Sequence, residues 1–530
     1  MDPTSFSAKF PYPSRRTPVL AQNVVATSQP LATQAGVDML RIGGNAVDAA
    51  LAAAITLTVV EPTGNGIGSD AFALIWDGDK LHGLNGSGKS PAAWSVRHFQ
   101  RYRELPLTGW DTVTVPGAVH AWYELSRRFG KLEFAALFEP AIRYAAEGFL
   151  VTPTIAALWS EAEQQYRHFD EFAKVFLPEG KSPAAGDRFA CPDQAETLRL
   201  IAATKGQAFY EGTIADKIAA CAAEGGGLLT VEDLAAHRSQ WVDPIRITYR
   251  GTDVHELPPN GQGLAALIAL GLLHHHDIGR FPPDSVESLH LQVEAMKIAL
   301  AEAWRHISDP AAMQVEPVSL LQDAFLRQRA SEIRMERAGR PTAGALGEKG
   351  TVYLTAADAS GMMVSYIQSN YMGFGSGIVV PGTGISLQNR GVGFSLQPGH
   401  PNQVAGGKKP FHTIIPGFAT RQGQPVLSFG VMGGNMQPQG HLQMVVRICD
   451  YGFNPQAASD APRWCLTEDF QLAIEPGFDP GVAEALRARG HRMVVDPAPK
   501  IFGGAQLIAK LKDGYCAASD HRKDGQAAGF

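Results

Sequence analysis

The sequence Lys349-Gly350-Thr351 is the place where this chain could carry out chemistry without a cofactor. A threonine hydroxyl is a weak nucleophile, but a free α-amine on the same residue, with a pKa of about 8, can serve as its base. Gly350 offers little steric hindrance to attack by the Thr351 hydroxyl on the Gly350 carbonyl. Cleavage of the Gly350–Thr351 bond would therefore make Thr351 an N-terminal nucleophile. The alternative is a threonine that only opens a strand, where threonine is common.

Two glycine clusters do not predict a phosphate site. Gly64-x-Gly66-x-Gly68 lacks the spacing G-x-G-x-x-G and follows a predicted helix instead of a strand. The cluster around Gly375 has an equally unsuitable context. Neither cluster therefore supports dinucleotide chemistry.

His274, His275, His276 and Asp277 form a dense group of potential metal ligands. Consecutive residues point in different directions on a helix, whereas helical ligand pairs stand at i and i+3 or i+4. We therefore interpret this group as a solvated helix end. No H-E-x-x-H or G-x-S-x-G motif is present, so the usual signals for a zinc protease and a nucleophile-elbow hydrolase are missing. Neither a metal nor a cofactor is expected.

The composition describes a large folded protein. Of 530 residues, 45% are hydrophobic and 18% are charged, which is ample material for a core. The net charge of −6 argues against nucleic acid as a partner, because nucleic-acid binders need a basic face. Five scattered cysteines without a C-x-x-C pair predict neither a disulfide framework nor a zinc site. No signal-peptide core or membrane-spanning run is found, so a cytoplasmic protein is expected.

The pattern of apolar residues divides the chain into a helix-rich first part and a strand-rich last part. Residues 31–60 predict two helices, the second nearly all apolar and capped by Asn45. Residues 70–86 predict a β-hairpin, and helical patterns then dominate to about residue 340. The unpatterned segment 341–350 predicts a flexible joint. Two strands are expected in 351–369, and strands, turns and glycines in most of the remainder.

Eight separated segments carry the motifs of one family. They are GGNAVDAALAAAITLTVVEPTGNGIG (43–68), TVPGAVHAW (114–122), LPPNGQG (257–263), EAMKIALAEAWRHISDP (294–310), TVYLTAADASGMMVS (351–365), GFGSGIVVPGTGISLQNR (373–390), MGGN (432–435) and DYGFNPQAASDAPRW (450–464). In this order they resemble the γ-glutamyltranspeptidase family of N-terminal-nucleophile hydrolases, and the resemblance spans most of the chain.

The resemblance implies a four-layer αββα sandwich of the α/β class and a precursor that cuts itself between Gly350 and Thr351. The products would be a large subunit, 1–350, and a small subunit, 351–530, that stay associated as one globular unit. Association of two such heterodimers stays open. The Thr351 hydroxyl would attack a substrate amide and form an acyl-enzyme, which water or an acceptor amine releases.

The resemblance also assigns three further residues to the chemistry. Gly433 and Gly434 match the family's glycine pair whose backbone N–H groups hold the oxyanion, a task in which the backbone must approach the reacting centre closely. Ser369 matches a hydroxyl beside the nucleophile, so it would orient and polarise Thr351.

The chain departs from the family in the residues that recognise a glutamyl group. Ser87 stands where a family arginine grips the α-carboxylate of the substrate. Val392-Gly393 replace the paired aspartates that hold its α-amine, and His412-Thr413 replace the tandem serines. The residues implied in catalysis are kept, whereas those that read a glutamyl group are not.

These departures resemble the cytoplasmic, lid-poor branch of the family that includes oxamate amidohydrolase, since the stretch between Phe394 and Lys408 is too short for a lid loop. An α-keto-acid amide such as oxamate carries a carboxylate but no α-amine, so an aspartate would repel it. The candidates for holding the carboxylate are Arg390, Asn370, Tyr371, His412 and Thr413. Arg390 could equally form a structural salt bridge, and His412 could be a packed, neutral core histidine.

The expected function is that of an autoprocessed amidohydrolase acting on the amide of a small acid of the oxamate type. The alternatives are γ-glutamyl transfer or glutathione hydrolysis, with Lys89 or Arg390 replacing the missing arginine, and a glutaryl or cephalosporin acylase. A non-catalytic binding protein is disfavoured because Thr351, Ser369 and the glycine pair are all present. The expected partner is a small-molecule amide, with neither nucleic acid nor membrane.

Overall fold

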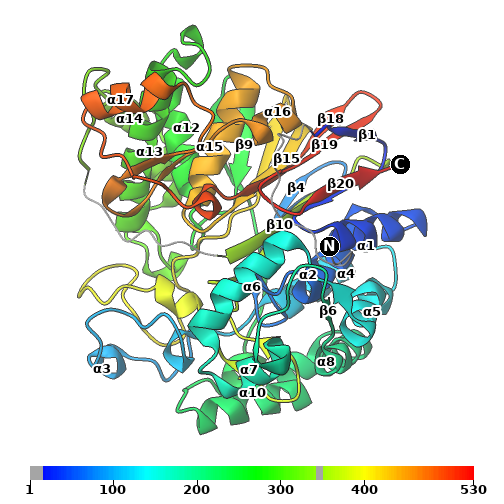
Figure 1. Ribbon diagram of the computed structural model, residues 1–530. Coiled ribbons are helices and arrows are strands. Elements are labelled where there is room, and N and C mark those ends of the chain that lie inside the picture. Colours follow the sequence, from blue (N-terminus) through cyan, green and yellow to red (C-terminus); the bar gives the residue numbers. More distant parts are fainter. Residues whose placement is uncertain (1–15, 342–349) are drawn as a thin grey trace, which may run out of the picture.

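The computed structural model describes residues 16–341 and 350–530. Two seven-stranded antiparallel sheets lie face to face, and helices cover the outer face of each (Figure 1). This order of layers confirms the expected αββα sandwich. The predicted flexible joint lies, except for its two ends, outside the described residues, and so does the amino-terminal segment 1–15.

The first sheet has the strand order β1-β19-β18-β15-β14-β9-β8. Its strands are β1 (Val19–Ala21), β8 (Ile245–Tyr249), β9 (Thr252–Glu256), β14 (Gly417–Arg421), β15 (Gln424–Met432), β18 (Gly504–Leu511) and β19 (Gly514–Ser519). Its long central strand β15 ends directly before the predicted oxyanion glycines.

The second sheet has the order β20-β2-β10-β11-β3-β4-β7. Its strands are β2 (Val24–Thr27), β3 (Asp70–Trp76), β4 (Leu81–Asn85), β7 (Gln240–Val242), β10 (Gly350–Ala357), β11 (Met363–Tyr371) and β20 (Gln526–Gly529). The pairs β3–β4 and β10–β11 are the two hairpins that the sequence predicts. Each sheet contains strands from both sides of residue 350, so 1–350 and 351–530 are interleaved.

Apolar side chains from both sheets meet in the inner core. Phe72, Tyr353 and Ile367 of the second sheet pack in one cluster with Phe418 and Ile508 of the first. Strand β10 pairs with β11 from Gly350 to Ala357, and with β2 from Leu354 to Ala357. The pairing with β11 therefore positions Thr351.

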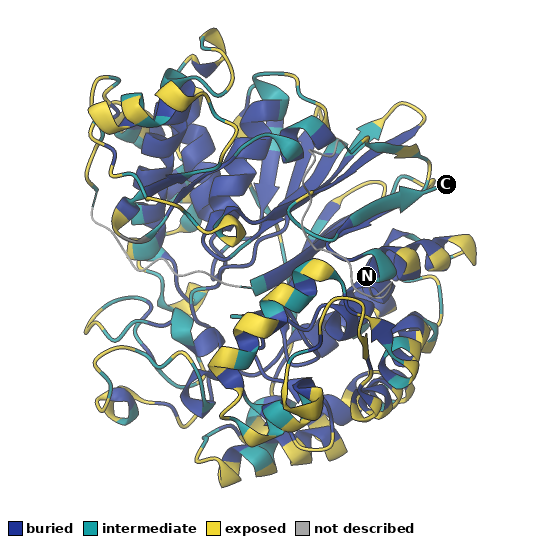
Figure 2. Ribbon diagram, in the orientation of Figure 1, coloured by how far each residue is buried: buried dark blue, intermediate teal, exposed yellow. Residues whose placement is uncertain are grey.

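Helices α1 (Pro30–Arg41) and α2 (Ala46–Val60) are the two helices predicted in residues 31–60, and they pack on the outer face of the second sheet. All fifteen residues of α2 are buried, and Asn45 and Asp48 form a capping box at its start. The other helices associated with this half are α3 (Val96–Phe99), α4 (Ala118–Phe129), α5 (Glu139–Glu147), α6 (Pro153–Tyr166), α7 (Asp170–Phe176), α8 (Pro192–Ala203), α9 (Gln207–Glu211), α10 (Thr213–Glu224) and α11 (Val231–Ala235). Figure 2 shows that their exposed residues face away from the sheets.

Helices α12 (Gly263–His274), α13 (Val286–His306) and α15 (Met436–Cys449) cover the first sheet. The remaining helices are α14 (Asp323–Ala330), α16 (Pro455–Asp460) and α17 (Pro480–Ala488). None of the helices in the described part of the chain is long and apolar enough to cross a membrane. All five cysteines are free thiols.

Strands β7, β8 and β9 interrupt the region that the sequence predicts to be dominated by helices. In β8, partly buried residues alternate with exposed ones, which is the pattern of a strand with one covered face. Its five residues were too few to stand out among the longer helical patterns on either side. The strand-rich last part likewise contains α15, whose fourteen residues pack across the first sheet.

Candidate active site

A β-bulge in β11 lies opposite Thr351. Gly350 pairs with Tyr371 and Val352 pairs with Gln368, so β11 uses one residue more than β10 over this interval. Two residues of β11 therefore face Thr351 alone. Bulges often re-aim a side chain next to an active site.

The bulge places the hydroxyl of Ser369 beside that of Thr351. Thr351 Oγ1 lies 3.1 Å from Ser369 Oγ and 2.7 Å from the carbonyl oxygen of Gly350. Ser369 Oγ donates to the same carbonyl at 2.9 Å and accepts the N–H of Tyr371 at 2.8 Å. Both hydroxyl residues are fully buried. The predicted nucleophile, its neighbouring hydroxyl and the carbonyl of the predicted cleavage site thus form one constellation.

The glycines of residues 64–68 let the loop after α2 approach the nucleophile. A Cβ at Gly64 would lie 3.3 Å from the carbonyl oxygen of Thr351, and one at Gly68 would lie 2.3 Å from that of Ser386. The backbone of Asn370 closes this contact by donating to Gly64 O at 3.3 Å. Close packing around the site, and not phosphate binding, requires this glycine pattern.

Gly433 and Gly434 form the turn between β15 and α15. Their φ angles of 134° and 60° lie in the region that favours glycine. Neither N–H donates a hydrogen bond to any described residue, and both stand at the amino-terminal, positive end of α15. Free N–H groups at such a position suit the stabilisation of an oxyanion.

Gln262 holds this glycine turn, a role that was not predicted from the sequence. Its side-chain Nε2 donates to the carbonyl oxygens of Thr413 at 2.6 Å and Gly434 at 2.9 Å. Gln262 is fully buried and belongs to the segment LPPNGQG, which matched the family motif. The motif was visible in the sequence, but the role of this side chain follows from contacts across 172 residues of chain.

Arg390 is a buried cation with most of its donors unused. Its Nη1 donates to Thr413 Oγ1 at 2.7 Å, and its guanidinium lies 4.8 Å from the centre of the Tyr371 ring. Its Nε and Nη2 have no hydrogen-bond partner, and it forms no ion pair among the described residues. Burial lowers the pKa of Arg390 to about 9, against the opposing attraction of Asp70. Arg390 therefore does not form the alternative structural salt bridge with any described residue.

Asp70 is a second charged residue of this region, missed in the sequence. Its carboxylate accepts the N–H groups of Gly88 at 3.3 Å and Gly117 at 3.0 Å, and lies 3.1 Å from Nε2 of His412. Nδ1 of His412 accepts the N–H of Ile414, so Nε2 carries the proton and donates to Asp70.

Burial determines the charges of this pair. It holds the pKa of His412 well below its ordinary value, with the nearby Arg390 acting in the same direction. It also raises the pKa of Asp70 to about 7, although Arg390 opposes this. Of the two interpretations of His412, the packed and neutral core histidine describes its surroundings.

Asn370 is held by the fold on both sides of its amide. Its Oδ1 accepts from Ser69 at 2.8 Å, and its Nδ2 donates to Ser386 at 2.9 Å. Tyr371 has a φ of 80°, a strained backbone conformation for a bulky residue, and its ring supports Arg390. Arg390 keeps donors for a ligand, whereas the side-chain amide of Asn370 anchors the glycine loop.

Ser87 and Lys89 belong to the segment that departs from the family, and they differ in burial. Ser87 is buried and donates to Asn85 at 2.7 Å, so its hydroxyl supports the local fold. Lys89 is exposed, which leaves Arg390 as the buried cation of the two that the sequence analysis considered. Phe394, at the start of the short stretch, packs its ring against that of Trp94, with ring centres 6.2 Å apart.

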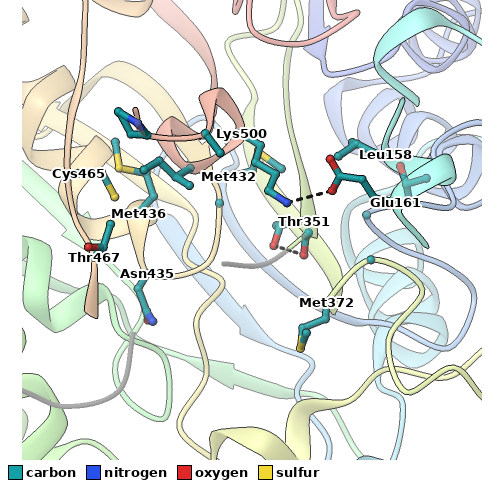
Figure 3. A pocket seen from close by; sticks show the side chains of 18 of the residues that line it. Leu158, Glu161, Thr351, Met372, Met432, Asn435, Met436, Cys465, Thr467 and Lys500 are labelled. Carbon is teal, nitrogen blue, oxygen red and sulfur yellow. Dashed lines mark hydrogen bonds and ion pairs between the residues drawn. The ribbon is translucent and has the colours of Figure 1, made fainter. Parts of the chain in front are cut away.

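A cavity of about 550 Å³ opens beside Thr351 (Figure 3). Of the predicted residues, Gly350, Thr351 and Gly433 line it. The five residues predicted to bind the substrate do not line this cavity. The structure therefore places Thr351 and Gly433 at the cavity, whereas Ser369, Gly434 and the Arg390 group do not line it.

Two histidine clusters do not provide a metal site that their surroundings support. His290, Glu294 and His491 have potential ligand atoms within 4.8 Å of one another, but Lys297 Nζ lies 2.8 Å from Glu294 and 3.3 Å from His491. This ammonium group already supplies the positive charge between them. The cluster that begins at His274 marks the end of α12, as predicted.

Comparisons with known proteins agree with this geometry. The gamma-glutamyltranspeptidase family profile matches residues 32–530. The chain is 35% identical to the oxamate amidohydrolase proenzyme of Klebsiella pneumoniae, over 94% of this chain and 97% of that protein. It is 34% identical to a glutathione hydrolase-like proenzyme of Bacillus subtilis, over 96% and 98% of the two chains. The crystal structure of cephalosporin acylase from Bacillus halodurans superposes with a TM-score of 0.95 at 49% identity, covering 99% of each chain.

The fold and the site thus define an amide-bond hydrolase of the N-terminal-nucleophile class. The chain belongs to the gamma-glutamyltranspeptidase family. The sequence-based assignment of family and fold is therefore confirmed.

Proposed function

We propose that this chain is an autoprocessed amidohydrolase whose nucleophile is Thr351 and whose substrate is the amide of a small, anionic carboxylic acid. The Thr351 hydroxyl attacks the Gly350 carbonyl, the peptide bond shifts to an ester, and water hydrolyses this ester. The products are 1–350 and 351–530. The arrangement of Thr351 Oγ1, Ser369 Oγ and Gly350 O supports this step, because both hydroxyls lie beside the carbonyl that must be polarised.

After cleavage, the α-amine of Thr351 is the base for attack on a substrate amide. The N–H groups of Gly433 and Gly434 hold the oxyanion, and the acyl-enzyme is then hydrolysed by water. Proenzyme names among the relatives support a precursor of this kind. That two heterodimers associate, and that the protein is cytoplasmic, stay predictions from the sequence.

The observation that carries the choice of substrate is Arg390, a fully buried cation with two nitrogens that lack a partner. A buried donor without a partner is costly, and a carboxylate with bidentate geometry would satisfy it. Oxamate is the simplest amide with such a carboxylate and no α-amine. The similarity to an oxamate amidohydrolase proenzyme supports the same choice.

Acylase activity is a second candidate, because the cavity of about 550 Å³ is far larger than oxamate requires. The similarity to a cephalosporin acylase structure agrees with this candidate. Both candidates share the threonine chemistry; they differ in the amine that leaves and, for a glutaryl amide, also in the acid.

The test combines processing with a substrate panel. The purified protein should give two bands on a denaturing gel, and the Thr351→Ala variant should stay full length and inactive. Ammonia or amine release is then measured for oxamate, glutamine, glutathione and a glutaryl amide. Turnover of glutamine and glutathione but not of oxamate would contradict the proposed acid, and two bands from Thr351→Ala would contradict the nucleophile.

A further inference from the structure

The cavity beside Thr351 is available for the half of the substrate that Arg390 does not hold. Thr351 and Gly433 line it, and none of the five residues considered for the acyl group does. An amide whose carbonyl carbon lies at Thr351 and whose carboxylate lies at Arg390 must direct its nitrogen elsewhere. This step rests on the proposed function, and it assigns the cavity to the amine half.

Asn435 contributes an unsatisfied acceptor to this cavity (Figure 3). Its side chain is 6% exposed, and its Oδ1 has no hydrogen-bond partner. It follows Gly434 directly and stands at the N-cap of α15, yet its side chain makes no capping hydrogen bond. An asparagine in this position usually accepts an N–H of the first turn, so its ordinary structural use is absent here.

A buried oxygen without a donor is unfavourable, and a ligand N–H would remove this cost. Asn435 lies next to the oxyanion glycines, and this position indicates that the N–H is that of the scissile amide. When the carbonyl oxygen of a substrate amide occupies the N–H groups of Gly433 and Gly434, the amide nitrogen is one bond away from the carbonyl carbon. Asn435 is the residue of the glycine turn whose side chain lines the cavity in which that nitrogen lies.

The walls of the cavity describe the rest of the amine. Apolar side chains line it, among them Leu158, Met372, Met432, Met436, Val494 and Ile501. Methionine is flexible and polarisable, so several methionines suit apolar groups of different shapes. At the cavity, Lys500 of the small part is paired with Glu161 of the large part at 3.0 Å, as Figure 3 shows. Glu61, Asp496 and Lys523 line the cavity as well, so the apolar side chains indicate only that the body of the amine is apolar.

We propose that the cavity binds the amine half of the substrate, an amine with an apolar body, and that Asn435 Oδ1 accepts the N–H of the scissile amide. Asn435 is then a substrate-contacting residue that selects amides over esters. The apolar walls select substituted amides over primary ones. Oxamate itself would use the acyl half of the site and leave the cavity largely unfilled.

The experiment compares two substrates that differ only in the group bonded to the carbonyl carbon, which is an N–H in the amide and an oxygen in the ester. N-Benzyloxamate and the monobenzyl ester of oxalic acid share the acid and the benzyl group, but only the amide offers an N–H. The ratio of their kcat/KM values is measured for the processed wild type, Asn435→Ala and Met436→Leu. Since kcat/KM reports the steps through acylation, both values refer to attack by Thr351.

We expect the amide-to-ester ratio to fall at least tenfold in Asn435→Ala, and to stay within twofold in Met436→Leu, which changes the wall but no polar group. The wild type should also prefer N-benzyloxamate to oxamate by at least tenfold. An unchanged ratio in Asn435→Ala, or a wild-type preference for oxamate, overturns the inference while the proposed function stands. A wild type that stays full length and hydrolyses no amide overturns the proposed function and the inference together.

Discussion

The side-chain nitrogen of Gln262 lies 2.9 Å from the carbonyl oxygen of Gly434. The same nitrogen lies 2.6 Å from the carbonyl oxygen of Thr413, whose hydroxyl accepts from Arg390. One buried amide therefore connects the turn that would hold the oxyanion with the segment that supports the buried cation.

Gln262→Leu should lower kcat about tenfold, which is about 1.4 kcal/mol of transition-state stabilisation. Leucine fills a similar volume but cannot donate to Gly434, so the glycine turn loses its support. Gln262 does not line the cavity beside Thr351, so KM should change much less than kcat. Steady-state kinetics on an anionic amide separate the two effects.

The matched control is Gln194→Leu. Gln194 is also buried, and its Nε2 donates to a backbone carbonyl, that of Thr58, at 3.0 Å. This variant loses the same kind of hydrogen bond away from the glycine turn, so it should lower Tm without lowering kcat. Equal loss of kcat in both variants would show that Gln262 acts through general stability.

Ser369→Ala should slow self-cleavage by about a hundredfold, in the range that loss of one oxyanion donor produces. Ser369 donates to the Gly350 carbonyl, and alanine leaves this carbonyl without that donor. The measurement is the appearance of the two bands on a denaturing gel over time. Ser369→Thr keeps the hydroxyl and should keep most of the rate.

Ser365→Ala is the control for strand packing, because Ser365 is a buried serine of the same strand that bonds the Tyr353 hydroxyl at 2.8 Å. It should be cleaved at nearly the wild-type rate. If Ser369→Ala were cleaved as fast as Ser365→Ala, polarisation of the Gly350 carbonyl by Ser369 would have to be abandoned.

Arg390→Met should raise KM for an anionic amide about tenfold or more, which is the usual effect of losing a charged hydrogen bond. For a neutral amide of similar size, KM should change little, because no carboxylate needs the guanidinium. Tm should stay equal or increase, since methionine removes a buried charge that has no ion-pair partner among the described residues.

Arg463→Met provides the contrast. Arg463 is equally buried but forms an ion pair with Asp520 at 2.5 Å, so its loss leaves the buried Asp520 with a longer contact of 3.2 Å to Arg522. This variant should lower Tm clearly. A comparable loss of Tm in Arg390→Met, with equal effects on anionic and neutral amides, would make Arg390 a structural residue.

The sequence predicted the parts of the site that lie in continuous motifs. Thr351 and Ser369 stand on adjacent strands of a predicted hairpin, so their contact follows from local geometry and one bulge. Gly433 and Gly434 follow a strand that the sequence predicts, whereas the helix after them, α15, was not predicted.

Asn435, Gln262 and Asp70 were missed because their importance depends on tertiary burial. An asparagine before a helix usually caps that helix, and only the structure shows that the side chain of Asn435 makes no capping hydrogen bond. Gln262 contacts a glycine that is distant in the sequence, and Asp70 looks like the first residue of an ordinary strand. Whether Arg390 has a counter-ion likewise cannot be read from its neighbours in the chain.

Glu61 provides a prediction about pH. It lines the cavity, is fully buried and accepts a hydrogen bond from Ser28 at 2.5 Å. Burial raises the pKa of Glu61 from its ordinary 4.5 to about 7, although Lys523 opposes this. The folded protein therefore holds a proton that the unfolded chain releases between these two values.

The sign of the effect follows from this difference. The stability contributed by the bound proton is fully present below pH 4.5 and is lost as the pH rises through about 7. The loss corresponds to about 3 kcal/mol. Glu61→Gln cannot ionise, so its Tm relative to the parent should increase between pH 5 and pH 8. The measurement uses the Thr351→Ala background, which should remain one chain, with Glu161→Gln as an exposed control from the same cavity. A Tm difference for Glu61→Gln that does not change with pH would show that Glu61 does not take up a proton on folding.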